Sequence, residues 1–151
     1  MQVEALRSEC PHLPRVVWKT DLHGTPEALD LLDGVVDVYL ADFKFGNDAC
    51  ARRLAGVERY VEILERNLRS VSERGDLIVR HLLLPGHWDC CFRPWTLWLS
   101  RHLPQARLSI RDGYLPHWQA EHYEELGRPL PARYADRARG FAHEAGLQLI
   151  D

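Results

Sequence analysis

Short apolar segments alternate along this chain with longer amphipathic segments. Each apolar segment is bounded by turn-forming residues, a pattern typical of buried β-strands. The segments are RVVW (15–18), VVDVYLADFKFG (35–46), DLIVRHLLLPG (76–86), ARLSIRDGY (106–114) and LQLI (147–150). The pattern therefore predicts five strands.

Helices are predicted between these strands. Thr25 can cap a helix that starts at Pro26 and ends at Gly34, and Asp48 is predicted to cap the next helical segment. A longer helix is expected over 57–74, where the apolar residues fall on one face. Three more helices are expected over residues 2–9, 94–102 and 132–145.

The alternation of strands and helices predicts an α/β fold with parallel strands and crossover helices. The strands are nearly continuous apolar runs, which indicates that both faces of the sheet are covered. The 151 residues suit one domain. A closed eight-stranded barrel takes about 200 residues or more, so we expect an open sheet or part of a barrel.

Composition narrows the classes of partner. The formal net charge of −3 gives no reason to expect nucleic acid. The apolar runs are too short for a membrane span and no signal peptide is visible, so a cytoplasmic location is the default expectation.

The four cysteines have none of the spacings typical of metal sites. Disulfides are not expected in a reducing compartment, and neither is a zinc or iron–sulfur site formed by this chain alone. The segment HWDCC (87–91) is interpreted as a polar loop with buried thiols, because no second cluster of ligands is apparent.

Polar side chains are concentrated where the predicted strands end. In parallel α/β sheets these ends meet at one edge, where ligands bind. Arg80 alternates in phase with Ile78 and Leu82, so its charge needs a partner, and Asp42 is the candidate. A structural ion pair and a ligand site both remain open at this point. The strand-end residues are Lys19, Thr20, Asp21, Asp42, Lys44, Arg80, His81, Arg111, Asp112 and Tyr114.

No dinucleotide-binding, P-loop or nucleophile-elbow motif occurs in the sequence. Several segments in fixed order instead resemble radical S-adenosylmethionine proteins of the pyruvate formate-lyase activating enzyme type, in particular an uncharacterised branch of that group. They are VVWKT, TPEALDLLDGVVDVYLADFKFG, VRHLLLPGH, YEELGR and ARGFAHEAGLQLID. The resemblance extends from about Leu13 to Asp151.

The resemblance implies a partial (β/α)6 barrel that binds a 4Fe-4S cluster and S-adenosylmethionine. It implies that Asp42, Lys44 and Arg80 lie near the methionyl end of the cofactor. A carboxylate and an amine on one ligand suit an adjacent cation and anion. Lys19 and Thr20 stand in the motif that follows the first strand, with Lys19 at an expected ribose contact.

The chain departs from the family pattern in ways that bear on activity. The cluster-binding C-x3-C-x2-C motif and the glycine-rich motif of the family's second strand are absent from the 151 residues. The sequence corresponds to the C-terminal half of the domain, without its first three strands. We therefore predict no catalytic residue and no metal ligand in this chain. Leu22 replaces a glycine, and DGYLPHW (112–118) replaces an aromatic-arginine-proline run.

Three hypotheses follow. The chain is part of a radical enzyme whose cluster-bearing N-terminal half is supplied separately, with a glycyl-radical-type protein as a possible partner. Alternatively, it is a degenerate remnant without chemistry. In the third hypothesis it is a protein-binding half-barrel, which could form homo-oligomers through an exposed edge strand at residues 15–18.

Overall fold

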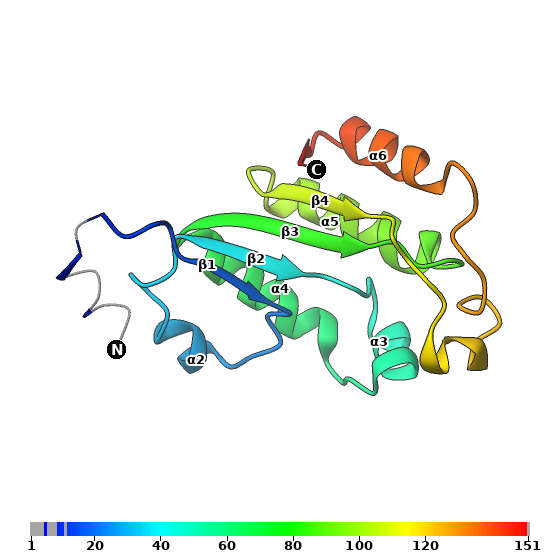
Figure 1. Ribbon diagram of the computed structural model, residues 1–151, viewed down its shortest axis with the longest axis horizontal. Coiled ribbons are helices and arrows are strands. Elements are labelled where there is room, and N and C mark those ends of the chain that lie inside the picture. The colour runs from blue at the N-terminus through cyan, green and yellow to red at the C-terminus, as the bar shows by residue number, and fades with distance from the viewer. Residues whose placement is uncertain (1–4, 6–8, 11, 151) are drawn as a thin grey trace.

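The computed structural model describes residues 5, 9, 10 and 12–150 (Figure 1). The helix expected over residues 2–9 lies largely outside the described residues. The α/β prediction is confirmed, because parallel strands alternate with helices along the chain. Within the described part of the chain, no helix is both long and apolar enough to cross a bilayer.

The five predicted strands form one parallel sheet. Its order, β1-β2-β3-β4-β5, is the order of the strands in the sequence. The strands are β1 (Val17–Thr20), β2 (Val38–Asp42), β3 (Asp76–Leu82), β4 (Arg107–Arg111) and β5 (Gln148–Leu149). The prediction of a buried first strand is wrong, because β1 starts two residues later and lies at the sheet edge, where Val17 is 55% exposed.

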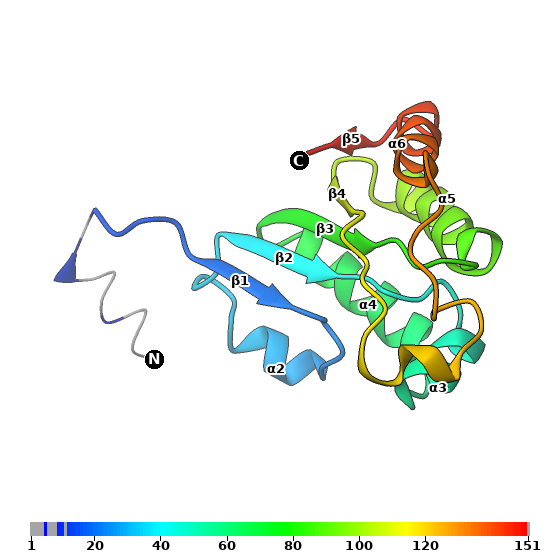
Figure 2. The ribbon, with the colours of Figure 1, turned by 45° about the vertical axis from the view of Figure 1, so that its right-hand side comes forward.

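Five helices are defined in the described residues: α2 (Pro26–Asp30), α3 (Asp48–Ala55), α4 (Tyr60–Ser72), α5 (Arg93–His102) and α6 (Tyr134–Glu144). A π-helical turn (Trp88–Phe92) leads into α5, and a 3-10 turn (Trp118–His122) lies in the loop after β4. Helices α4 and α5 lie behind the sheet in Figure 1, and Figure 2 shows the same layering after rotation.

Side-chain caps explain the starts of α2 and α3. The Thr25 side chain accepts a hydrogen bond from the Ala28 N–H, as expected for an N-cap. The predicted cap at Asp48 is wrong, because Asn47 caps α3 by accepting from the Cys50 N–H. Asp48 instead accepts a 2.8 Å hydrogen bond from the Val61 N–H, which joins α3 to the start of α4.

The hydrophobic core lies between the sheet and the helices. Alternate strand residues point into it, among them Tyr39, Val79 and Leu108, which are all completely buried. Phe43 follows β2 and stacks on Trp95 of α5, with ring centroids 3.4 Å apart. The tryptophans of α5 therefore belong to the packing of this face.

The opposite side of the sheet, here called the open face, carries no helix among the described residues. Leu40, Ile78 and Arg80 lie on it and are only partly buried, and Val17 and Lys19 are exposed. The expectation that both faces are covered is therefore wrong for the described part of the chain. Apolar residues point to both faces, but helices cover one.

Candidate functional site

Asp42 and Arg80 form the ion pair that the sequence predicts. Strands β2 and β3 are paired so that these two residues are direct neighbours on the open face. Arg80 Nε and Nη2 donate to the two Asp42 carboxylate oxygens at 2.6 and 2.7 Å. This forked hydrogen bonding raises the pKa of Arg80 above its ordinary value. Both side chains keep solvent access, at 26% for Arg80 and 18% for Asp42.

The pair lines a hollow of about 260 Å³ at the C-terminal ends of β2, β3 and β4. This strand-end hollow is lined by Asp42, Lys44, Arg80, Leu82 and Arg111. Three side chains are cationic and one is anionic, and the anion is already paired with Arg80. The surplus of positive charge favours an anionic group on a ligand.

The backbone after β2 is held in place by α4. The Lys44 N–H donates a 2.8 Å hydrogen bond to the Tyr60 hydroxyl, at the first residue of α4. Tyr60 is buried, and burial raises the pKa of its hydroxyl well above the ordinary range. The phenol therefore stays protonated, and the segment that presents Lys44 is fixed from the core side.

Lys19 and Thr20 do not line the strand-end hollow. Lys19 lies on the open face of β1 and pairs in register with Leu40. The Thr20 hydroxyl accepts a hydrogen bond from the Leu22 N–H within its own turn. Leu22 has a left-handed backbone (φ 54°) and is 1% exposed, so a residue with a side chain fills a conformation that favours glycine.

The remaining strand-end residues have structural partners. His81 points into the core, where its Nδ1 lies 2.7 Å from the Phe43 carbonyl oxygen. Burial lowers the pKa of His81 to about 4, so the imidazole is neutral near pH 7. Asp112 pairs with Arg139 at 3.0 Å, and the Tyr114 hydroxyl donates to the Leu126 carbonyl oxygen.

The structure contradicts the premise that HWDCC has no partner for metal binding. Cys50 of α3 meets His87, Cys90 and Cys91, and the ligand atoms of these four residues all lie within 4.8 Å of one another. Burial raises the pKa of both vicinal thiols and lowers the pKa of His87. Sequence reasoning missed this group, here called the thiol cluster, because Cys50 is separated from His87 by a helix and a strand.

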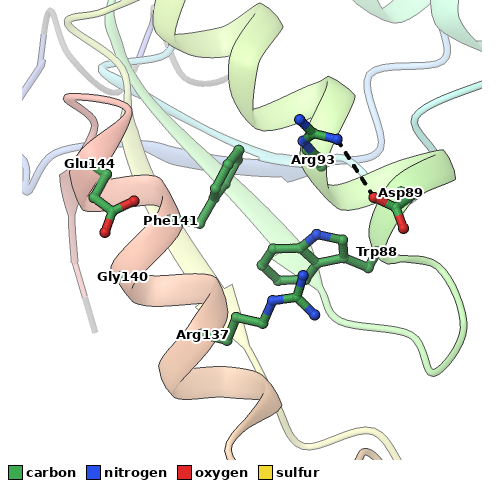
Figure 3. A pocket seen from close by; sticks show the side chains of 7 residues that line it. All are labelled: Trp88, Asp89, Arg93, Arg137, Gly140, Phe141 and Glu144. Atoms are coloured by element: carbon green, nitrogen blue, oxygen red, sulfur yellow. Dashed lines mark ion pairs between the residues drawn. The ribbon is translucent and has the colours of Figure 1, made fainter.

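A second hollow, of about 410 Å³, lies between the π-helical turn and α6 (Figure 3). The Arg137 guanidinium stacks over the Trp88 ring at 3.8 Å from its centroid, and Arg93 pairs with Asp89 at 3.8 Å. None of the predicted site residues lines it. The stacked guanidinium packs against the ring and joins α6 to the π-helical turn, so we interpret these residues as structural contacts between the two elements.

No protein-family model matches this chain. The chain is similar to a protein of Methanocaldococcus jannaschii named "Uncharacterized protein MJ0674", with 38% identity over 135 residues. The match covers 89% of this chain and 40% of the relative. The chain thus spans about two-fifths of the length of the curated relative it matches.

Proposed function

We propose that this chain is the C-terminal portion of a radical S-adenosylmethionine enzyme that resembles glycyl-radical-enzyme activating proteins. It would bind the cofactor at the strand ends once a 4Fe-4S-bearing N-terminal half completes the site. The observation that carries the proposal is the meeting of Asp42, Lys44 and Arg80 in one hollow. These are the residues that the family resemblance assigns to the methionyl end of the cofactor.

The arrangement of the sheet supports a partial barrel. The strands follow one another in sequence order, as in β/α barrels. In doubly wound folds the strand order reverses at a switch point, and helices cover both faces. Among the described residues the strand order has no reversal, and the helices lie on one side of the sheet (Figure 2). The open face would then be part of the barrel interior.

The strand-end hollow suits one end of a larger ligand. Its volume of about 260 Å³ lies below the roughly 300–1,000 Å³ of typical small-molecule pockets. Lys44 and Arg111 offer charges for a carboxylate, while the Asp42 carboxylate can accept from an ammonium group. An amino-acid head group would therefore be held here, with the rest of the cofactor reaching beyond these residues.

The side chains of this chain suit S-adenosylmethionine but not the 4Fe-4S cluster. The strand-end hollow fits the methionyl group, whereas the family's cysteine motif is absent from these 151 residues. The ligand atoms of the thiol cluster lie too close together for a four-iron cluster and suit a single ion. When bound beside a 4Fe-4S cluster, S-adenosylmethionine supplies a deoxyadenosyl radical that abstracts hydrogen. The residues of this chain bind and orient the head group.

The test begins with the DNA upstream of Met1. A C-x3-C-x2-C segment there, in frame or in an adjacent frame, would be co-expressed with this chain and reconstituted anaerobically with iron and sulfide. We expect reductive cleavage of S-adenosylmethionine only when both parts are present. Absence of such a segment, or no cleavage by the reconstituted pair, contradicts the proposal.

The site assignment is tested separately by equilibrium binding of S-adenosylmethionine to the completed protein. We expect Asp42→Ala and Arg80→Ala to weaken binding. Arg74→Ala is the matched control, because Arg74 is similarly exposed at 22% and pairs with Asp30 at 2.6 Å. It lies in the turn before β3, at the opposite end of this strand from the hollow. Unchanged binding in both site variants means that the assignment of these residues is wrong.

A second candidate function is a protein-binding half-barrel without catalysis. The open face favours it, because Val17 is exposed at the sheet edge and Leu40 and Ile78 are only partly buried. Sedimentation equilibrium of the purified chain separates the two candidates. A stable oligomer that does not bind S-adenosylmethionine in any reconstituted form supports the second.

A further inference from the structure

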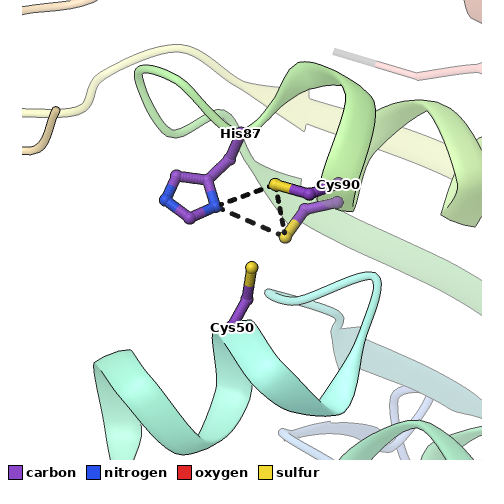
Figure 4. A group of neighbouring side chains, drawn as sticks. Cys50, His87 and Cys90 are labelled. Carbon is purple, nitrogen blue, oxygen red and sulfur yellow. Dashed lines mark hydrogen bonds between the residues drawn. The ribbon is translucent and has the colours of Figure 1, made fainter.

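The thiol cluster combines three sulfur ligands and one nitrogen ligand from two separate parts of the chain. Cys50 comes from the first turn of α3, and Cys90 and Cys91 come from the π-helical turn after β3. His87 is the residue at the N-terminal cap of this turn, and Figure 4 shows it with Cys50 and Cys90. His87 Nδ1 lies 3.3 Å from Cys90 Sγ and 3.5 Å from Cys91 Sγ. The two vicinal sulfurs are 3.8 Å apart.

These separations are close to the edges of a tetrahedron around one zinc ion. Zinc lies about 2.3 Å from cysteine sulfur and about 2.0–2.1 Å from histidine nitrogen. At tetrahedral angles these bonds give sulfur–sulfur edges of about 3.8 Å and sulfur–nitrogen edges of about 3.6 Å. From this geometry we propose that Cys50, His87, Cys90 and Cys91 bind a single Zn²⁺ ion.

The backbone around the thiol cluster is arranged to bring the four ligands together. The His87 carbonyl oxygen accepts from both the Cys91 and the Phe92 N–H groups at 3.1 Å, which widens the turn. This π-helical geometry lets the adjacent residues Cys90 and Cys91 direct both sulfurs toward His87. Such turns are rare and occur frequently at functional sites.

Asn47 connects the two parts of the cluster. Its Oδ1 caps α3 at the Cys50 N–H, while its Nδ2 donates to the Cys90 carbonyl oxygen at 2.7 Å. The same Nδ2 lies 3.3 Å from Cys50 Sγ. Cys50 also lies at the positive end of the α3 dipole, which favours the negative charge of a thiolate ligand.

A carboxylate stands behind the histidine ligand. His87 Nε2 is buried without a hydrogen-bond partner among the described residues, and it lies 3.5 Å from Glu125 Oε1. Zinc-bound histidines commonly donate their second ring N–H to a carboxylate, which fixes the ring and its tautomer. Arg53 of α3 pairs with the same carboxylate and holds it beside the ring.

The choice of zinc follows from the ligand set. Three thiolates and one imidazole with no vacant position match structural zinc sites, whereas catalytic sites keep one position for water. The soft sulfur ligands disfavour magnesium and calcium. The ion would tie the segment after β2 to the segment after β3, and so brace the loop that carries Lys44. The proposed zinc site does not depend on whether the chain binds S-adenosylmethionine.

The experiment measures metal in the intact chain. Protein purified under reducing conditions is loaded with Zn²⁺, freed of excess ion and analysed by mass spectrometry for metal content. We expect one zinc per chain. Replacement with Co²⁺ should give strong sulfur-to-cobalt charge-transfer bands and the intense visible bands of a tetrahedral site. Neither readout requires enzymatic activity.

Variants identify the ligands. We expect Cys50→Ser to lose stoichiometric zinc and Cys10→Ser to keep it, because Cys10 is exposed and lies outside the thiol cluster. Glu125→Gln keeps all four ligands and should lower zinc affinity by about 10- to 100-fold. Circular dichroism of each variant distinguishes loss of the ion from loss of the fold.

The proposal is overturned if the wild-type chain binds no stoichiometric zinc, or if Cys50→Ser and Cys10→Ser bind it equally. A protein mass lower by two hydrogens, with no metal uptake either before or after a reductant is added, also overturns it. That result would instead assign the vicinal thiols to disulfide chemistry.

Discussion

The two faces of the sheet are built from the same strands but differ in burial and in charge. The helix-covered face is a continuous apolar core that includes Tyr39, Val79 and Leu108. The open face carries the Asp42–Arg80 pair and partly exposed leucine and isoleucine side chains. Burial on one side supplies the stability that lets the other side present charges, so effects of substitutions should depend chiefly on the face.

The largest expected difference is between two adjacent leucines. Leu83 is completely buried in the core, whereas Leu82 lies on the open face beside the strand-end hollow. We expect Leu83→Ala to lower the free energy of unfolding by about 2–5 kcal/mol, because it leaves a cavity. Leu82→Ala should cost about 1 kcal/mol or less, since its site is open to solvent. Urea unfolding of both variants measures the difference, and equal losses would mean that the open face is covered in solution.

The next effect concerns His81, the buried imidazole of the covered face. Its folded-state pKa of about 4 lies below its unfolded value, so the unfolded chain binds a proton that the folded chain rejects. Stability should therefore fall as pH drops from about 6.5 to 4, by about 3 kcal/mol in total. His81→Gln should flatten this part of the pH profile, measured by urea unfolding at several pH values, and an unchanged slope would contradict the prediction.

A smaller effect is expected for the ion pair of the open face. Asp42→Asn removes the charge but keeps the size of the side chain, and it should cost about 1–2 kcal/mol because both partners are partly buried. A double-mutant cycle with Arg80→Met isolates the coupling between the two side chains. A coupling energy near zero would indicate that solvent screens the pair as it does on an ordinary surface.

The smallest effect is expected at the exposed edge. Val17→Ser should change the free energy of unfolding of the monomer by no more than about 0.5 kcal/mol, since Val17 is 55% exposed. The measurement is the midpoint of thermal unfolding at several protein concentrations. A midpoint that rises with concentration in the wild type but not in the variant would show that β1 is buried between copies.

The sequence predicted the order and type of the elements well because their signals are local. Apolar runs bounded by turn residues identified all five strands, and the phase of Arg80 within its strand predicted the pairing with Asp42. Asp48 shows the limit of local reasoning. Asn47 and Asp48 are both good caps, and the choice depended on a contact between Asp48 and the Val61 N–H.

Features that depend on tertiary packing could not be predicted in this way. Strand periodicity does not reveal which face the helices cover, so the open face was missed. The approach of Cys50 to Cys90 and Cys91 depends on α3 packing against the turn after β3, and no spacing motif encodes it. His81 was counted among the strand-end residues with Arg80, yet successive strand residues point to opposite faces, and His81 lies in the core.

The close contact between the segments after β2 and β3 has a consequence for how homologous sequences can diverge. At Gly46 an added Cβ atom would lie 2.6 Å from the Cα atom of Cys91. Any side chain at position 46 would therefore require the backbone of one of the two segments to move. Selection at position 46 is therefore tied to the backbone path at position 91, whatever side chain stands there. Homologues that keep the π-helical turn should keep glycine at 46, and lineages that lose this glycine should have rebuilt both segments together.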